Sequence, residues 1–248
     1  MSGWIDLAGP TDAPPIVFLH GAGANRGMWR WQLDALSDAY RVIVPDLPGH
    51  GDHPDRNWRF DESVTAVREV LDEHAGGRAL VVGLSLGGYI GIGLAAQHPD
   101  RVAGLVLSGS TVEYLGWGGL NTRLFGGLVR VIAPLLRRMN EKSMARLDNR
   151  KAGEALVEIG MSMKAASQSL MRLPGRDFHA MGEAYPGPTL ILNGERDKVN
   201  RPAEDAAAAR WGAEVVVLED CGHACGITQP EAFADQVREF AARVGDNA

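Results

Sequence analysis

The 248-residue sequence predicts an α/β fold in which a mostly parallel, doubly wound sheet carries a helical insertion. Three observations lead to this prediction. Six short segments are apolar throughout, a pattern typical of strands that helices cover on both faces. Helical segments alternate with these strands over most of the chain, as parallel connections require. The alternation stops between residues 112 and 185, where no strand-like run occurs.

Each predicted strand ends at a turn signal such as Gly, Pro, Asn or Asp. The first ends before His20-Gly21, and the third ends at Gly83. The six strands are predicted at residues 16–19, 41–44, 79–82, 102–107, 189–192 and 215–218. Five helices are predicted beside them, at residues 28–36, 61–74, 85–97, 202–211 and 230–244.

The segment from 112 to 185 differs from the rest of the chain in charge. It contains 11 Lys and Arg residues against 7 Asp and Glu residues, a net charge of +4, whereas the whole chain stands at −6. Six of the eight methionines also fall here: Met139, Met144, Met161, Met163, Met171 and Met181. We expect several helices with breaks near residues 116–119 and 174–175, lying over the sheet edge where α/β proteins bind ligands. The predicted core is therefore residues 1–111 and 186–248, and the inserted domain is residues 112–185.

Composition and charge argue against several classes of function. The chain is 45% hydrophobic and 23% charged, as is typical of a soluble globular protein. A net charge of −6 without a dense Lys/Arg run argues against a nucleic-acid partner. No stretch approaches the ~18 apolar residues of a membrane span. The N-terminus lacks the basic and apolar regions of a secretory signal, so we expect a cytoplasmic protein.

The only cysteines, Cys221 and Cys225, flank His223. A zinc site needs three or four ligands, and these three residues are too cramped to supply them. A disulfide is not expected in a cytoplasmic chain. We expect the two thiols to pack as small, soft side chains beside a functional loop, without a metal.

The strongest motif is Gly83-Leu-Ser-Leu-Gly87, between a predicted strand and a predicted helix. This context matches the G-x-S-x-G turn that exposes a nucleophilic serine. The glycines leave room for the neighbouring strand and helix, and the helix N-terminus favours negative charge that develops nearby. Ser85 is therefore the predicted nucleophile.

Attack by a serine on a carbonyl requires two N–H donors for the developing oxyanion. The Leu86 N–H, directly after the nucleophile, is one predicted donor. The Ala22 N–H is the other, because His20-Gly-Ala-Gly23 follows the first strand and its glycines allow the backbone to approach a ligand. His20 itself is expected to hold this loop rather than to react.

A serine hydroxyl is a weak nucleophile and needs a general base, which an acid must orient. Of the seven histidines, only His223 follows the final predicted strand in a glycine-hinged loop, and it is the predicted base. Asp197 follows the fifth strand and is the predicted acid, which gives the expected order Ser, Asp, His. Glu113, after the fourth strand, stays an alternative acid.

Methionine side chains adapt to irregular apolar shapes, so those of the insertion are expected to roof an apolar pocket. The predicted substrate-binding residues are Met161, Met163, Met171 and Cys225. His50 and His53 lie in a glycine-rich loop and are further candidates for the pocket wall.

Arg123, Arg130 and Arg137 recur at intervals of seven and are expected to share one helix face. Two interpretations stay open. The face is either simply solvated, or it attracts an acidic substrate or an acidic carrier protein that bears an acyl chain.

These motifs resemble the α/β-hydrolase superfamily, and most closely its small capped carboxylesterases, lactonases and methyl-ester hydrolases. The matching segments are His20–Gly23 with Met28-Trp29, Pro45–Gly51, Gly83–Gly88, His98–Val102, Gly194–Asp197 and Gly222-His223. The resemblance implies that the insertion is a cap and that no cofactor is needed. Family members commonly begin with an antiparallel strand pair, but Trp4–Leu7 supplies one strand at most, so we expect the N-terminal sheet edge to be trimmed.

The resemblance further implies a serine hydrolase that forms an acyl-enzyme and cleaves a carboxylic ester or lactone of a small to medium apolar substrate. Acyltransferases, perhydrolases, lyases and C–C bond hydrolases of this fold use the same residues, and fold alone does not choose among them. A small-molecule receptor is a further alternative, which the presence of all three predicted catalytic residues disfavours.

Overall fold

The computed structural model describes residues 3–144 and 146–246, and its centre is a seven-stranded sheet. The strands are β1 (Ile5–Ala8), β2 (Pro15–Leu19), β3 (Arg41–Pro45), β4 (Ala79–Leu84), β5 (Val102–Ser108), β6 (Thr189–Gly194) and β7 (Glu214–Leu218). Their order in the sheet is β1-β3-β2-β4-β5-β6-β7, and every neighbouring pair is parallel except β1 and β3. The predicted fold class is confirmed, and the N-terminal edge holds the single antiparallel strand that was expected.

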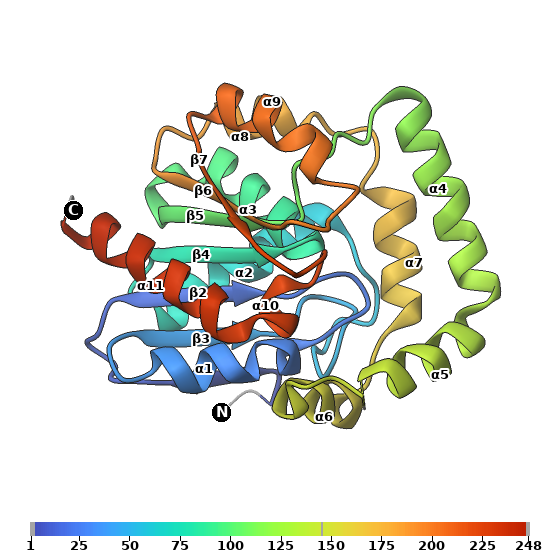
Figure 1. Ribbon diagram of the computed structural model, residues 1–248, viewed down its shortest axis with the longest axis horizontal. Helices are drawn as coiled ribbons and strands as arrows, with labels where there is room; N and C mark the ends of the chain where they lie inside the picture. Colours follow the sequence, from blue (N-terminus) through green and yellow to red (C-terminus); the bar gives the residue numbers. More distant parts are fainter. Residues whose placement is uncertain (1–2, 145, 247–248) are drawn as a thin grey trace.

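Helices cover both faces of the sheet (Figure 1). One face is covered by α1 (Arg30–Leu36), α10 (Cys225–Thr228) and α11 (Pro230–Asp246). The other is covered by α2 (Phe60–His74), α3 (Leu86–Gln97), α8 (Phe178–Glu183) and α9 (Arg201–Trp211). Short 3₁₀ turns lie at Arg26–Trp29 and Pro99–Arg101. Within residues 3–144 and 146–246, no helix combines the length and the apolar character that crossing a bilayer requires.

Successive side chains of each strand alternate between two hydrophobic cores. In β2, Val17 and Leu19 belong to the core beneath α2 and α3, whereas Ile16 and Phe18 belong to the core beneath α1 and α11. None of the four is more than 1% exposed. Both faces of the strand are therefore apolar, which is why the sequence shows a continuous apolar run instead of an alternating one.

The direction of the chain across the sheet reverses at β2. The chain passes from β2 to β3 on one side and then crosses to β4 on the other side. Loops that leave such a point in opposite directions open a crevice at the carboxyl edge of the sheet. Because Leu19 pairs with Gly83, the His20–Gly23 loop and the turn at Ser85 leave the sheet side by side.

The described part of residues 112–185 contains five helices and no strand. The first four are α4 (Gly116–Val131), α5 (Ala133–Met144), α6 (Arg150–Ile159) and α7 (Met163–Arg172). Helices α4, α5 and α7 lie beyond one end of the strands, with α4 outermost (Figure 1). Helix α8 packs against α3 and α9 instead, and so belongs to the layer that covers the sheet.

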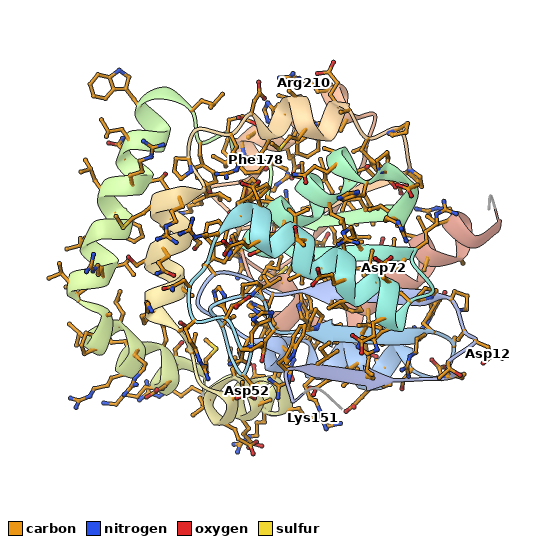
Figure 2. All side chains as sticks on the ribbon, turned by 180° about the vertical axis from the view of Figure 1, so that it is seen from behind. Asp12, Asp52, Asp72, Lys151, Phe178 and Arg210 are labelled. Carbon is orange, nitrogen blue, oxygen red and sulfur yellow. The ribbon has the colours of Figure 1, made fainter. Side chains whose placement is uncertain are left out.

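Phe178 fixes α8 in that layer. Its side chain is 1% exposed, and its ring centroid lies 4.6 Å from that of Tyr89 and 5.7 Å from that of Phe60. Figure 2 shows Phe178 where the insertion returns to the helices behind the sheet. The break predicted near Pro174-Gly175 is confirmed, since it separates α7 from α8.

The break predicted at residues 116–119 is only the start of a helix. Gly116 begins α4, and the helix continues through Gly118 and Gly119. A Cβ on Gly119 would lie 2.3 Å from the carbonyl oxygen of Tyr114, which precedes the helix, so this glycine allows the incoming backbone to pass close to α4.

The three arginines at intervals of seven do not share one helix face. Arg123 and Arg130 lie on α4, but Arg137 lies on α5. Between the helices, Ile132 leaves the helical conformation, with φ of −96° and ψ of 13°, and Pro134 in the first turn of α5 has no N–H to continue α4. The prediction is wrong for Arg137, because a seven-residue repeat keeps one face only in an unbroken helix.

Candidate active site

Ser85 lies at the tight turn between β4 and α3, with φ of +53° and ψ of −114°. Residues other than glycine rarely adopt a positive φ, which costs on the order of 1–3 kcal/mol. Four hydrogen bonds hold the strained peptide. The Ser85 N–H donates to the Ser108 carbonyl at 2.7 Å. The Ser85 carbonyl accepts from the Gly88 N–H at 3.0 Å, from the Tyr89 N–H at 3.2 Å and from Ser110 Oγ at 2.9 Å. The turn places Ser85 at the N-terminus of α3.

The glycines around Ser85 are required by close packing. A Cβ on Gly83 would lie 2.5 Å from the carbonyl carbon of Gly87. A Cβ on Gly87 would lie 2.2 Å from the Leu19 carbonyl oxygen. Neither contact leaves room for a side chain, so the steric role predicted for both glycines is confirmed.

His223 reaches the same edge of the sheet from the loop after β7. Its Nδ1 lies 2.8 Å from Oδ2 of Asp197, which follows β6. The Asp197 side chain is 2% exposed, whereas the His223 side chain is 48% exposed. This contact fixes the orientation of the imidazole ring and leaves Nε2 as the nitrogen that can exchange a proton with a ligand.

Asp197 is held by the backbone and side chain that follow it. The N–H groups of Val199 and Asn200 both donate to Oδ1 at 3.1 Å, and Asn200 Nδ2 donates to Oδ2 at 2.9 Å. Burial alone raises the pKa of Asp197, but the hydrogen bonds from His223 and Asn200 outweigh burial and lower that pKa to about 2. The carboxylate is therefore ionised at neutral pH and presents a fixed negative charge to His223.

Ser85 and His223 line one cavity of about 180 Å³. The other lining residues are Gly21, Ala22, Ala24, Met28, Leu84, Met144, Leu156, Met161, Ala224 and Ile227. Among the described residues that line it, none is Asp, Glu, Lys or Arg. The cavity is therefore lined by one hydroxyl and one imidazole, and its other walls are apolar.

Two backbone N–H groups near Ser85 are without an acceptor. Leu86 is the first residue of α3, where N–H groups lack a helical partner, and Ala22 lines the cavity. Within the described ranges, neither of these two N–H groups donates to a protein atom. The Gly23 N–H, in contrast, donates to His50 Nε2 at 3.1 Å and is not available to a ligand.

His20 and His50 lie buried beneath this loop, with ring centroids 4.9 Å apart. His20 Nε2 accepts the Leu47 N–H at 3.0 Å, and its Nδ1 lies 2.9 Å from the Gly21 carbonyl oxygen. Burial lowers the pKa of His20 to about 4 and holds the pKa of His50 well below its usual value. Both rings are therefore neutral, and His20 holds the loop, as the sequence predicts.

The predicted pocket role of His50 and His53 is wrong. Neither residue lines the cavity. His50 accepts the Gly23 N–H, and His53 packs edge-on against Trp4 with ring centroids 4.5 Å apart.

Of the four predicted substrate-binding residues, only Met161 lines the cavity. Met163, Met171 and Cys225 do not line it. Met163 packs over Gly23, and Met171 is 41% exposed in a different hollow. Both lie on α7, which packs against α4. Cys225 is fully buried with its Sγ 3.2 Å from Ser108 Oγ, because α10 turns this side chain into the core.

Glu113, the alternative acid, lies elsewhere. Its Oε1 accepts the His179 N–H at the start of α8. Burial raises the pKa of Glu113. The carboxylate beside His223 is Asp197, so the geometry favours Asp197 over Glu113 as the partner of His223.

Several residues of the site were not predicted from the sequence. They are Met28, Leu156 and Ile227 in the cavity wall and Asn200 beside Asp197. Asn200 has a sequence signal, because an asparagine three residues after an acid and two before Pro202 is typical of a side chain that holds a turn. These three wall residues come from three separate segments of the chain, and only the folded chain brings them together.

The cysteines and the remaining acidic groups do not form a metal site. Cys221 and Cys225 are buried, and neither takes part in a disulfide. In the part of the chain that the structure describes, no group of three or more His, Cys, Asp or Glu side chains is arranged to hold a metal ion.

Comparison with known proteins links this arrangement to one family. The sequence profile described as the Alpha/beta hydrolase family matches residues 16–236, which is most of the chain. The pimeloyl-[acyl-carrier protein] methyl ester esterase of Nitrosomonas europaea is 29% identical over 242 residues, which cover 90% of this chain and 93% of that relative. The 2-hydroxy-6-oxo-6-(2'-aminophenyl)hexa-2,4-dienoic acid hydrolase of Metapseudomonas resinovorans is 28% identical, with coverage of 94% and 85%.

A solved structure shows the same fold. It comes from work on carboxylesterases of Nitrososphaera gargenis and superposes with a TM-score of 0.82 at 20% sequence identity. The superposition covers 99% of this chain and 96% of the other.

Gly109 offers a test of how closely His223 must be held. It follows β5 with φ of +62°, and a Cβ there would lie 2.5 Å from His223 Cε1. In Gly109→Ala the ring must move, and a displacement of about 1 Å is expected to lower kcat/KM on a p-nitrophenyl ester about 10²-fold. Gly222→Ala is the matched control, because nothing lies within 4 Å of a Cβ at that neighbour of His223. Equal rates for both variants would contradict the tight placement.

Proposed function

The chain belongs to the Alpha/beta hydrolase family, and from that premise we propose that it is a serine hydrolase of carboxylic esters or lactones. One observation carries the proposal. Ser85 and His223 line the same small cavity, and His223 is hydrogen-bonded to the buried, ionised Asp197. The relative from Nitrosomonas europaea, named as a methyl ester esterase, supports an ester as substrate.

In the first half of the proposed reaction, Ser85 Oγ attacks the carbonyl carbon while His223 Nε2 takes the hydroxyl proton. Asp197 stabilises the imidazolium that forms. The negative charge moves to the carbonyl oxygen, which the N–H groups of Ala22 and Leu86 bind. The tetrahedral intermediate then collapses, the alcohol leaves with the proton held by His223, and the acyl group remains on Ser85.

In the second half, a water molecule replaces the alcohol. His223 Nε2 takes a proton from this water, and the resulting hydroxide attacks the acyl carbon. The bond to Ser85 Oγ breaks, and His223 returns its proton to the serine. The products are a carboxylic acid and the free enzyme, so release of the acid in the absence of any acceptor alcohol separates a hydrolase from an acyltransferase.

The cavity indicates the class of substrate. Its volume of about 180 Å³ suits a short or narrow group, and its walls are contributed mainly by Met28, Met144, Leu156, Met161 and Ile227. Without a charged residue to pair with a second ionic group, the part of the substrate next to the scissile bond is expected to be apolar. Methionine thioethers can adapt to more than one such shape.

An ester carried on an acidic carrier protein is a second candidate substrate. The relative from Nitrosomonas europaea is named for a substrate on acyl-carrier protein, and residues 112–185 of this chain carry a net charge of +4. Opposite charge speeds the encounter of two proteins, and the effect weakens with salt.

The carrier hypothesis predicts a change that depends on the substrate. Arg130→Gln/Arg138→Gln should raise KM for a carrier-linked methyl ester several-fold at low salt, because long-range attraction to the acidic carrier is reduced. The kinetic constants on a short neutral ester should stay unchanged. An unaltered KM for the carrier-linked ester at low and at high salt would remove the carrier as a partner of these arginines.

Replacing the nucleophile should abolish turnover. In Ser85→Ala, kcat is expected to fall by a factor on the order of 10⁶, because no other hydroxyl is placed to form the acyl-enzyme. The melting temperature should stay near that of the wild type, which shows that the fold survives. Activity within tenfold of the wild type would remove Ser85 from the mechanism.

The two candidate acids predict different outcomes. Asp197→Asn should lower kcat about 10⁴-fold, because His223 loses the carboxylate that orients it. Glu113→Gln is the matched control, since it also converts a carboxylate to an amide after a neighbouring strand, and it should leave kcat nearly unchanged. The reverse pattern would assign the role of the acid to Glu113.

A further inference from the structure

The outward side of α4 and α5 is unusually apolar. We call this surface the α4–α5 face. It consists of Trp117, Leu120, Leu124, Phe125, Leu128, Val131, Leu135 and Met139, all of them exposed. Trp117 is 80% exposed and Val131 is 77% exposed. Water-soluble proteins rarely expose a contiguous apolar surface of this extent unless something binds to it.

The packing of α4 explains why these side chains point outward. Helix α4 packs against α7, and its buried residues are Gly119, Gly126 and Val129. A Cβ on Gly126 would lie 2.9 Å from Leu170 Cβ and 2.9 Å from Met171 Cγ. No large side chain fits there, so α4 has the reverse of the usual arrangement, in which the large apolar residues face the protein.

The outward residues form one continuous stripe. Trp117, Leu124, Leu128 and Val131 follow one another at intervals of seven, four and three, which keeps them on one side of α4. Leu135 and Met139, four residues apart, continue the apolar surface on α5. Helix α4 forms the outermost edge of the molecule, and α5 forms the corner next to it (Figure 1). The stripe is therefore a protruding surface and not the wall of a groove.

Positive charge accompanies the stripe. Residues 115–144 contain five cationic side chains, Arg123, Arg130, Arg137, Arg138 and Lys142, and one acidic side chain, Glu141. All five cations are exposed. Glu141 pairs with Arg137 at 3.4 Å, which leaves a strong excess of positive charge on a protein whose total charge is −6.

The same edge of the insertion holds a cationic hollow of about 500 Å³ between α4, α5 and α7. Arg130, Lys164 and Arg172 line it, and no acidic residue is among its described lining residues. Lys164 Nζ donates to the Arg56 carbonyl at 3.2 Å, and Arg172 Nη1 donates to the Trp58 carbonyl. Two of the three cations are thus held in place by backbone carbonyls.

We propose that the α4–α5 face binds the surface of an anionic phospholipid bilayer. The apolar stripe would enter the boundary between headgroups and acyl chains, and the cations beside it would meet lipid phosphates. A second copy of the chain fits less well, because a symmetric contact would bring the two cationic edges together. An acidic carrier protein would also pair with the cations, and it is an alternative outcome of the test below.

The proposed surface leads toward the candidate active site. Met144, the last residue of α5, lines the cavity that holds Ser85. Docking of α5 on a bilayer would therefore bring the cavity wall near the lipid, from which an apolar ester could enter. This consequence rests on the proposed function, whereas the docking itself does not.

Vesicle co-sedimentation tests the docking without use of the activity. The full-length protein should bind vesicles of equal parts phosphatidylcholine and phosphatidylglycerol, more weakly in high salt, and should bind pure phosphatidylcholine vesicles much less. Leu124→Gln/Leu128→Gln should weaken partitioning about tenfold or more, because two exposed leucines that would enter the bilayer are lost. Ala206→Gln/Ala209→Gln, at exposed positions of α9, is the matched control and should bind like the wild type.

A charge variant gives an independent measurement. Arg130→Gln/Arg138→Gln should reduce binding to the anionic vesicles, whereas Arg210→Gln/Arg243→Gln, with the same loss of charge on other elements, should reduce it less. Turnover of a short water-soluble ester and the melting temperature verify that each variant is folded.

Three results would overturn the proposal. The first is no binding of the wild type to anionic vesicles at low salt. The second is equal vesicle binding by the wild type and Leu124→Gln/Leu128→Gln. The third is a stable dimer, or a complex with an acidic carrier protein, that this leucine variant disrupts while vesicles do not bind.

Discussion

The backbone of Ser85 is held at a positive φ, and the arrangement of the site depends on that constraint. The turn fits only because Gly83 and Gly87 carry no side chain where β4 meets α3 and β2. The Ser85 peptide is tied on the other side to β5, through the carbonyl of Ser108 and the hydroxyl of Ser110. Three neighbouring strands therefore fix one residue, and the strain is maintained by the packing of the sheet around it.

The ionisable groups near Ser85 differ in charge because they differ in burial and in hydrogen-bond partners. His20 and His50 are buried without a carboxylate, so they stay neutral and act as fixed hydrogen-bond partners of the loop. Asp197 is also buried, but His223 and Asn200 hydrogen-bond to it and keep it ionised. His223 is the half-exposed member, in contact with the cavity on one side and with a fixed negative charge on the other. The charge that orients His223 is thus protected from solvent, while His223 itself remains accessible.

Much of this arrangement could be predicted from local sequence, and the remainder could not. The strands were predictable because both of their faces are buried, which makes each one apolar at every position. Ser85, Asp197 and His223 each follow a strand, so their common edge followed from the chain order. Most of the cavity wall did not follow, because Leu156 of the insertion and Ile227 of α10 meet there only in the folded chain. The methionines of α7 do not line the cavity, and α4 packs on that helix through Gly126 and turns its own large residues outward.

Active-site labelling tests the central claim, that Ser85 is the nucleophile activated by His223 and Asp197, most directly. The protein is treated with a fluorophosphonate, and the modified residue is located by mass spectrometry of its peptides. We expect one adduct per chain, on Ser85, formed as esterase turnover is lost, and much slower labelling of Asp197→Asn. Complete loss of turnover with the adduct on another residue, or full turnover in a protein modified at Ser85, would contradict it.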